Sequence, residues 1–199
     1  MTVLPQHELR ALGRRDDFRS IRIMELGNKK NSSGLYRDWY ESQSASYFCI
    51  DTAGTDGAIQ WDVRSPMPDY ISETGPFDIV TNFGFTEHIC TNQLSCWENI
   101  HNMVHPAYGQ LSCVLPAPGS FTDSAAGRWY PHPAFFSQFA RMNGYEIEDL
   151  WVTCDEADRQ LACCRMHRLP ASRAKDFFFS PEYMYDNFTE TPFSKRLIW

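Results

Sequence analysis

The sequence of 199 residues has no run of eighteen apolar residues and no excess of basic ones. A transmembrane helix needs about 20 apolar residues, so we expect none here. The first twenty residues also lack the apolar core of a signal peptide, and we therefore expect a cytoplasmic protein without membrane contacts. Because 25 acidic residues outnumber 18 basic ones, the net charge is −7, which argues against broad binding to duplex nucleic acid.

The seven cysteines give no sign of a disulfide framework, since their number is odd and most of them lie inside apolar runs. Cys163 and Cys164 are adjacent in an expected strand, so their side chains would point to opposite faces. Among the cysteines and histidines of residues 88–105, only His101 and His105 have the spacing of structural zinc ligands. We therefore expect no metal, and we place these two histidines on a partly exposed helix face.

What the chain does contain is enough apolar material for one core, with 43% hydrophobic and 15% aromatic residues. Its length suits a single domain. We expect a lead-in segment at 1–19, the domain itself at 20–168 and an aromatic extension at 169–199. The extension is too rich in phenylalanine and tyrosine for a free tail, so it should pack on the domain or on a second subunit.

Short apolar runs alternate with helical patterns along the first two thirds of the chain. Strands are expected within 20–27, 47–51, 59–63, 77–82 and 110–115, and in a closing pair at 145–153 and 160–168. Helices are expected from residue 35 onward, at 93–104 and at 133–143. Ser32 or Ser33 would cap the first helix, and Gly144 would end the last. This alternation predicts parallel β-α-β units with right-handed crossovers.

Several short motifs follow one another in a characteristic order. They are Glu25-Leu26-Gly27, Cys49-Ile50-Asp51, Trp61-Asp62-Val63, Phe77-Asp78-Ile79-Val80 and Phe85-Thr86-Glu87-His88-Ile89. In this order they resemble class I S-adenosylmethionine-dependent methyltransferases over about residues 20–168. The resemblance implies a single Rossmann-like α/β domain, with a mostly parallel seven-stranded sheet, an antiparallel closing strand pair and helices on both faces. It also implies S-adenosylmethionine as cofactor and S-adenosylhomocysteine as product.

The resemblance places cofactor-binding residues at the ends of the first four expected strands. The first motif lies under the methionine part, the acid after the second strand accepts the ribose hydroxyls, and the acid after the third lies near adenine. The end of the fourth strand faces the methyl group. The matching residues are Glu25, Gly27, Asn28, Lys29, Asp51, Asp62, Asn82 and Phe83. Asp51 can also be interpreted simply as a turn former.

The loop after Gly27 departs from the family pattern, because Lys29 stands where a second glycine is expected. The lysine side chain would either fill the cofactor pocket or pair with the carboxylate of the cofactor. The first outcome predicts a domain that has lost catalysis, and the second predicts an altered cofactor binder.

The activity that the resemblance implies is methyl transfer to an oxygen or nitrogen of a small-molecule or nucleotide-like acceptor. The candidate bases are Glu87, His88 and His132. Glu87 and His88 can also be a helix-start acid beside a solvated histidine. The alternative function is a catalytically degenerate binding or assembly module, in which the aromatic extension would form a homo-oligomer. A nicotinamide-dependent oxidoreductase would need the pattern Gly-x-Gly-x-x-Gly, which is absent.

Overall fold

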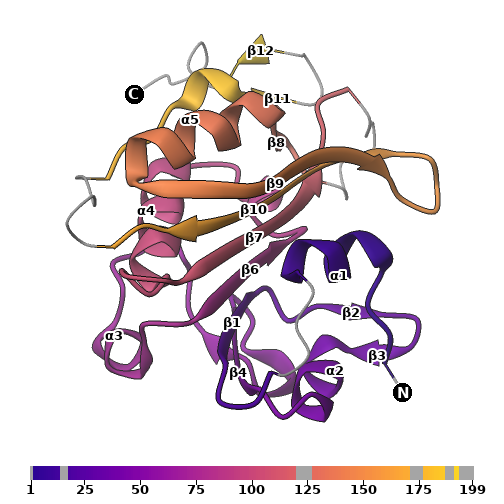
Figure 1. The fold of residues 1–199 in the computed structure, drawn as a ribbon, viewed down its shortest axis with the longest axis vertical. Coiled ribbons are helices and arrows are strands. Elements are labelled where there is room, and N and C mark those ends of the chain that lie inside the picture. Colours follow the sequence, from indigo (N-terminus) through magenta and orange to yellow (C-terminus); the bar gives the residue numbers. More distant parts are fainter. Residues whose placement is uncertain (1, 14–17, 120–126, 171–176, 187–190, 193–199) are drawn as a thin grey trace.

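A computed structural model describes residues 2–13, 18–119, 127–170, 177–186 and 191–192. Its centre is a seven-stranded sheet with the order β5-β4-β1-β6-β7-β10-β9 (Figure 1). The strands are β1 (Arg22–Leu26), β4 (Ser46–Asp51), β5 (Ile59–Gln60), β6 (Ile79–Phe83), β7 (Gln110–Pro116), β9 (Tyr145–Cys154) and β10 (Gln160–Arg168). The first five of these pair in parallel, and β10 is antiparallel to both of its neighbours. The predicted sheet with its antiparallel closing pair is confirmed.

Helices cover both faces of this sheet, as predicted. The helices are α1 (Gln6–Leu12), α2 (Tyr36–Ser42), α3 (Asp69–Thr74), α4 (Gln93–Met103) and α5 (Pro133–Asn143). Apolar side chains of α3, α4 and α5 form one core with the strands, whereas those of α1 and α2 form a second core. No helix among the described residues combines the length and apolar character needed to cross a membrane.

The strands read as continuous apolar runs because both of their faces are buried. In β1, Ile23 belongs to the α1/α2 core and the next residue, Met24, to the opposite core. Cys163 and Cys164 of β10 divide between the two cores in the same way. The predicted opposite orientation of these cysteines is thus confirmed, since successive side chains of a strand alternate between faces.

The segment between β1 and α2 differs from the prediction. Residues 30–35 form a small hairpin of β2 (Lys30–Asn31) and β3 (Gly34–Leu35), with the two serines at its turn. The serine cap was therefore wrong: Leu35 precedes α2 and makes no side-chain cap. Ser33 instead receives hydrogen bonds from the N-terminal segment, including one from Val3 N–H at 3.0 Å.

The last described segments extend the main domain. A second small sheet has the order β12-β11-β8, formed by β8 (Trp129–Pro131), β11 (Met184–Asp186) and β12 (Thr191–Pro192). The side-chain amide of Asn143 makes two hydrogen bonds with the backbone of Phe178, donating to its oxygen and accepting from its N–H. Phe177 and Phe179 pack against the α3/α4/α5 core. The predicted aromatic contacts of Phe188, Phe193 and Trp199 lie outside the described residues.

Candidate functional site

The carboxyl ends of β1, β4 and β5 bring three predicted residues to one edge of the sheet. Gly27 follows β1, Asp51 ends β4 and Asp62 follows β5. Backbone hydrogen bonds join each of these strand ends to the next. Gly27 N–H donates to the carbonyl oxygen of Ile50 at 2.8 Å, and Trp61 N–H donates to the carbonyl oxygen of Asp51 at 3.1 Å. In open α/β sheets this is the edge where ligands bind.

Gly27 allows the chain to turn sharply at this edge. Its φ of 73° lies in the left-handed region, where a side chain is strained. A Cβ at this position would also lie 2.8 Å from the Phe85 ring, which follows β6. The turn of β1 and the segment after β6 are therefore in close contact, and a larger residue would separate them.

The two acids at the edge differ in their surroundings. Asp51 is partly exposed, and one carboxylate oxygen accepts a hydrogen bond from Ala53 N–H at 2.7 Å. Asp62 receives the guanidinium of Arg64 on both carboxylate oxygens, with the shortest contact at 2.6 Å. The Arg64 hydrogen bonds lower the pKa of Asp62. Asn28 bridges the first two loops by donating to Thr55 O at 2.8 Å.

Lys29 points across the edge toward α1. Its Nζ lies 2.7 Å from Oε1 of Glu8, whose side chain is 1% exposed against 30% for the lysine. The same ammonium lies near Gly84 after β6, where an added Cβ would be 3.5 Å away. In this structure the lysine is therefore engaged with a carboxylate of the protein itself.

Glu25 is completely buried beneath the turn. One of its oxygens accepts a hydrogen bond from the Tyr47 hydroxyl of β4. Burial raises the pKa of Glu25 to about 8, although the Tyr47 hydrogen bond and the Lys29 charge act in the opposite direction. This carboxyl group is therefore largely protonated at neutral pH.

Glu87 and His88 follow β6 in a short 3-10 helix, Thr86–His88. Glu87 is buried, and burial raises its pKa to about 8 against the opposing charge of Lys29. His88 is half-exposed, with Nε2 at 3.8 Å from Oε1 of Glu87. Burial, with a smaller effect of Lys29, lowers the pKa of His88, so its ring is neutral at pH 7 and can accept a proton.

The remaining predicted residues have mainly local contacts. Asn82 is buried and exchanges two hydrogen bonds with Thr86, which fixes the segment after β6. The Phe83 side chain packs in the α1/α2 core. His132 caps α5 by accepting from Ala134 N–H at 3.1 Å, and its ring lies near Tyr185.

His101, expected on a partly exposed face, is in fact only 3% exposed. Its ring nitrogens contact the Tyr145 hydroxyl at 3.1 Å and the Arg168 guanidinium at 2.8 Å. The predicted exposure was wrong because β9 and β10 cover this side of α4. These strands lie far from α4 in the sequence, so the local pattern gave no sign of them.

Two residues of the site were missed in the sequence. Glu8 lay in a segment without a recognised motif, yet it shares a face of α1 with the buried Ala11 and Leu12. An acid at this spacing among apolar residues was an available signal. The other is Gly127, which packs so closely on Glu87 that a Cβ there would be 2.5 Å from its Cγ.

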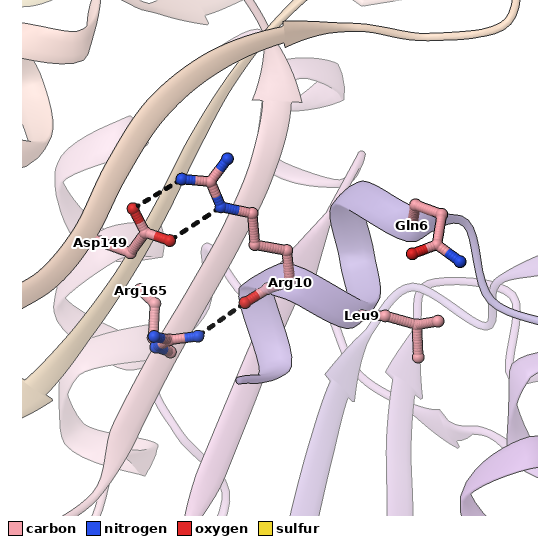
Figure 2. A pocket seen from close by; sticks show the side chains of 5 residues that line it. All are labelled: Gln6, Leu9, Arg10, Asp149 and Arg165. Carbon is pink, nitrogen blue, oxygen red and sulfur yellow. Dashed lines mark hydrogen bonds and ion pairs between the residues drawn. The ribbon is translucent and has the colours of Figure 1, made fainter. Parts of the chain in front are cut away.

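A separate cleft of about 640 Å³ lies between α1 and the β9–β10 pair (Figure 2). Arg10 donates two hydrogen bonds to Asp149 at 2.9 and 3.0 Å, and Arg165 donates to the backbone oxygen of Arg10 at 2.7 Å. These contacts join α1 to the outer strands. We interpret the cleft as a structural junction, because its charged groups bind one another.

No protein-family model matches the sequence, and no curated protein matches it. Solved structures do match. One is 1,6-didemethyltoxoflavin-N1-methyltransferase of Burkholderia thailandensis, with bound 1,6-didemethyltoxoflavin and S-adenosylhomocysteine. The two sequences are 11% identical, the match covers 76% of this chain and 72% of that chain, and the TM-score is 0.56. A variant of the 16S rRNA (adenine(1408)-N(1))-methyltransferase of Catenulisporales acidiphilia has 10% identity, covers 86% and 94% of the two chains, and has a TM-score of 0.55.

A third match is the N-methyltransferase NodS of Bradyrhizobium japonicum in complex with S-adenosylhomocysteine. It is 11% identical, with 75% of this chain and 79% of that chain covered and a TM-score of 0.51. At these identities the matches establish the fold. The chain has the fold of class I S-adenosylmethionine-dependent methyltransferases, as its motifs implied.

Proposed function

We propose that this protein is an S-adenosylmethionine-dependent methyltransferase. One observation carries the proposal: Gly27 follows β1, Asp51 ends β4 and Asp62 follows β5, three neighbouring strands, at the edge where open α/β sheets bind ligands. Asp51 would accept the two ribose hydroxyls, Gly27 would allow close approach of the methionine part, and Asp62 would lie near the adenine.

The chemistry requires little of the protein beyond alignment and a base. S-adenosylmethionine would supply the methyl group to the acceptor atom, with S-adenosylhomocysteine as the leaving group, and the protein would hold the two in line. If the acceptor is an O–H or N–H group, the neutral ring of His88 would take its proton. Glu87 lies beside this ring, with Oε1 at 3.8 Å from Nε2, but its raised pKa keeps the carboxyl group neutral at pH 7, so it would not act as the counter-charge of the imidazolium.

Lys29 would pair with the carboxylate of the cofactor. This role requires its ammonium to leave Oε1 of Glu8, to which it is bonded at 2.7 Å. The lysine side chain is 30% exposed and has four rotatable bonds, so it can move without unpacking the core. Cofactor binding and release of Glu8 would then occur together.

The same ion pair favours a second candidate function, the catalytically degenerate binding module. If Lys29 stays paired with Glu8, its side chain remains in the loop where the family has a glycine and does not pair with the cofactor. Asp62 already forms an ion pair with Arg64. This candidate predicts a domain that does not bind the cofactor.

Calorimetry with S-adenosylhomocysteine separates the two candidates. The methyltransferase proposal predicts binding, and Asp51→Asn should weaken it about 10- to 100-fold, since a hydrogen bond to a charged group is worth about 1.5–3 kcal/mol. Asp69→Asn, the same change at an exposed residue of α3, is the matched control and should bind as the wild type does. Absence of heat at millimolar ligand would instead support the binding module.

A further inference from the structure

A cavity of about 700 Å³ adjoins the candidate site on the side of α1. It lies between the N-terminal segment, the β2–β3 hairpin and the turn that joins β9 to β10. Its volume is in the range of small-molecule sites. Lys29 lines the cavity and also approaches Gly84 after β6, so the cavity meets the edge where the cofactor would bind.

Glu8 is the distinctive polar residue of this cavity. Its side chain is 1% exposed, and Oε1 is bonded to Lys29. Oε2 accepts no hydrogen bond of standard geometry from any residue that the structure describes; the hydroxyl group nearby is that of Tyr36, whose pKa is raised by burial and by its interaction with Glu8. Buried carboxylate oxygens are nearly always hydrogen-bonded, and an ionised carboxylate can only accept. Glu8 therefore has an acceptor that a donor group of a ligand can satisfy.

The charges that line the cavity favour a cation. Three carboxylates, Glu8, Asp155 and Glu156, face two basic side chains, Lys29 and Arg159. Arg159 is bonded to Asp155 at 2.7 Å. The lining as a whole carries an excess of one negative charge, because burial lowers the pKa of His7 and leaves that ring neutral at pH 7.

Apolar side chains and the ring of a tyrosine complete the lining. Leu4, Pro5 and Tyr36 face the same cavity, and Leu4 and Tyr36 are each 2% exposed. Aromatic and aliphatic walls with few polar groups are typical of sites for small organic molecules. A ligand that fits this lining has a cationic end and an apolar body.

We infer that the cavity binds a small molecule with an ammonium group next to an apolar group, and that Glu8 is the counter-ion of the ammonium. This molecule is then the methyl acceptor, an assignment that rests on the proposed function. The ammonium anchors the molecule, and a different atom receives the methyl group. When Lys29 turns to the cofactor, Glu8 loses its internal partner and becomes available to the ammonium.

The inference is tested by calorimetry with phenethylamine, and with 2-phenylethanol as the neutral molecule of similar shape. Phenethylamine should bind at least about tenfold more tightly than the alcohol, because only the amine carries the charge that Glu8 selects. Glu8→Gln should remove this preference. Glu73→Gln, the same change at an exposed residue of α3, should retain it.

Lys29→Met should increase the affinity for phenethylamine, a result that misfolding cannot produce. It should tighten phenethylamine binding several-fold, since Glu8 no longer has an internal cation, and it should weaken binding of S-adenosylhomocysteine. Equal binding of amine and alcohol, unchanged amine binding in Glu8→Gln, or no amine binding at millimolar concentration would overturn the inference. Binding of S-adenosylhomocysteine in those cases would leave the proposed function intact. Amine binding without binding of S-adenosylhomocysteine would overturn the proposed function and the acceptor role, and would leave only the amine site.

Discussion

Lys29 Nζ lies 2.7 Å from Oε1 of Glu8, so the residue that replaces a glycine of the family pattern is paired with a helix at the N-terminal end of the chain. The pair joins the turn after β1 to α1, which in turn packs on β7 and β10. The partners are unequal, because the lysine is 30% exposed and the glutamate only 1%.

Lys29→Met should destabilise the fold more than Glu8→Gln does. The first change leaves a buried carboxylate without a cation, at a cost of about 2–4 kcal/mol in the free energy of unfolding. The second leaves an ammonium that can reach water, so about 1–2 kcal/mol is expected. Urea unfolding at pH 7 measures both, and the double variant should lose less than the sum of the two. A greater loss in Glu8→Gln would contradict the unequal burial.

Stability should fall as the pH rises from about 7 to 8, above the range in which the buried histidines act in the opposite direction. Burial raises the pKa of Glu25 and of Glu87 from 4.5 to about 8, so the folded protein holds protons that the unfolded chain has released. The unfolded state binds fewer protons in this window, and the slope is therefore negative, by up to about 1.4 kcal/mol per pH unit for each group.

Urea unfolding at several pH values measures this slope. Glu25→Gln and Glu87→Gln should each flatten it, because an amide does not ionise. Glu73→Gln in the exposed part of α3 should leave it unchanged. A wild-type stability that rises between pH 7 and 8 would show that neither carboxyl is held protonated.

Gly27→Ala should reduce both stability and S-adenosylhomocysteine binding. A non-glycine residue at a φ of 73° costs about 1–2 kcal/mol, and the new methyl group would meet the Phe85 ring at 2.8 Å. Thermal unfolding and calorimetry measure the two effects, and Phe85→Leu in the same chain should restore part of the stability.

A matched control for this change is Gly75→Ala. Gly75 has a φ of −75°, and an added Cβ would have its nearest neighbours at an ordinary 3.5 Å. The variant should unfold near the wild-type temperature. If it lost as much stability as Gly27→Ala, the left-handed turn at Gly27 would not be the cause.

The ring of His88 should titrate below 6.5, because burial and the Lys29 charge lower its pKa. NMR titration of the imidazole, assigned with His88→Gln, measures this value directly. Lys29→Met should move the titration of His88 to higher pH, since the repelling charge is gone. A midpoint above 6.5 in the wild type would remove the physical basis for a neutral base at pH 7.

Much of the fold could be predicted because it depends on short stretches of chain. The buried strands follow from apolar runs such as the one before Gly27, and α5 has the bounds that its spacing and Gly144 indicated. The hairpin at residues 30–35 could not be predicted. Its two strands contain only two residues each and are held by contacts with the N-terminal segment, so no periodicity marks them.

For the candidate site, the local pattern was sufficient to place Gly27, Asp51 and Asp62 at the ends of strands, because a turn after an apolar run is a local property. Only the tertiary structure decided the state of each group. Glu8 and Lys29 are 21 residues apart and meet through the packing of α1. The protonation of Glu25 and Glu87 depends on burial beneath segments from elsewhere in the chain. Burial and pairing are properties of the assembled molecule, and for that reason the orientation of Lys29 could be known only from the fold.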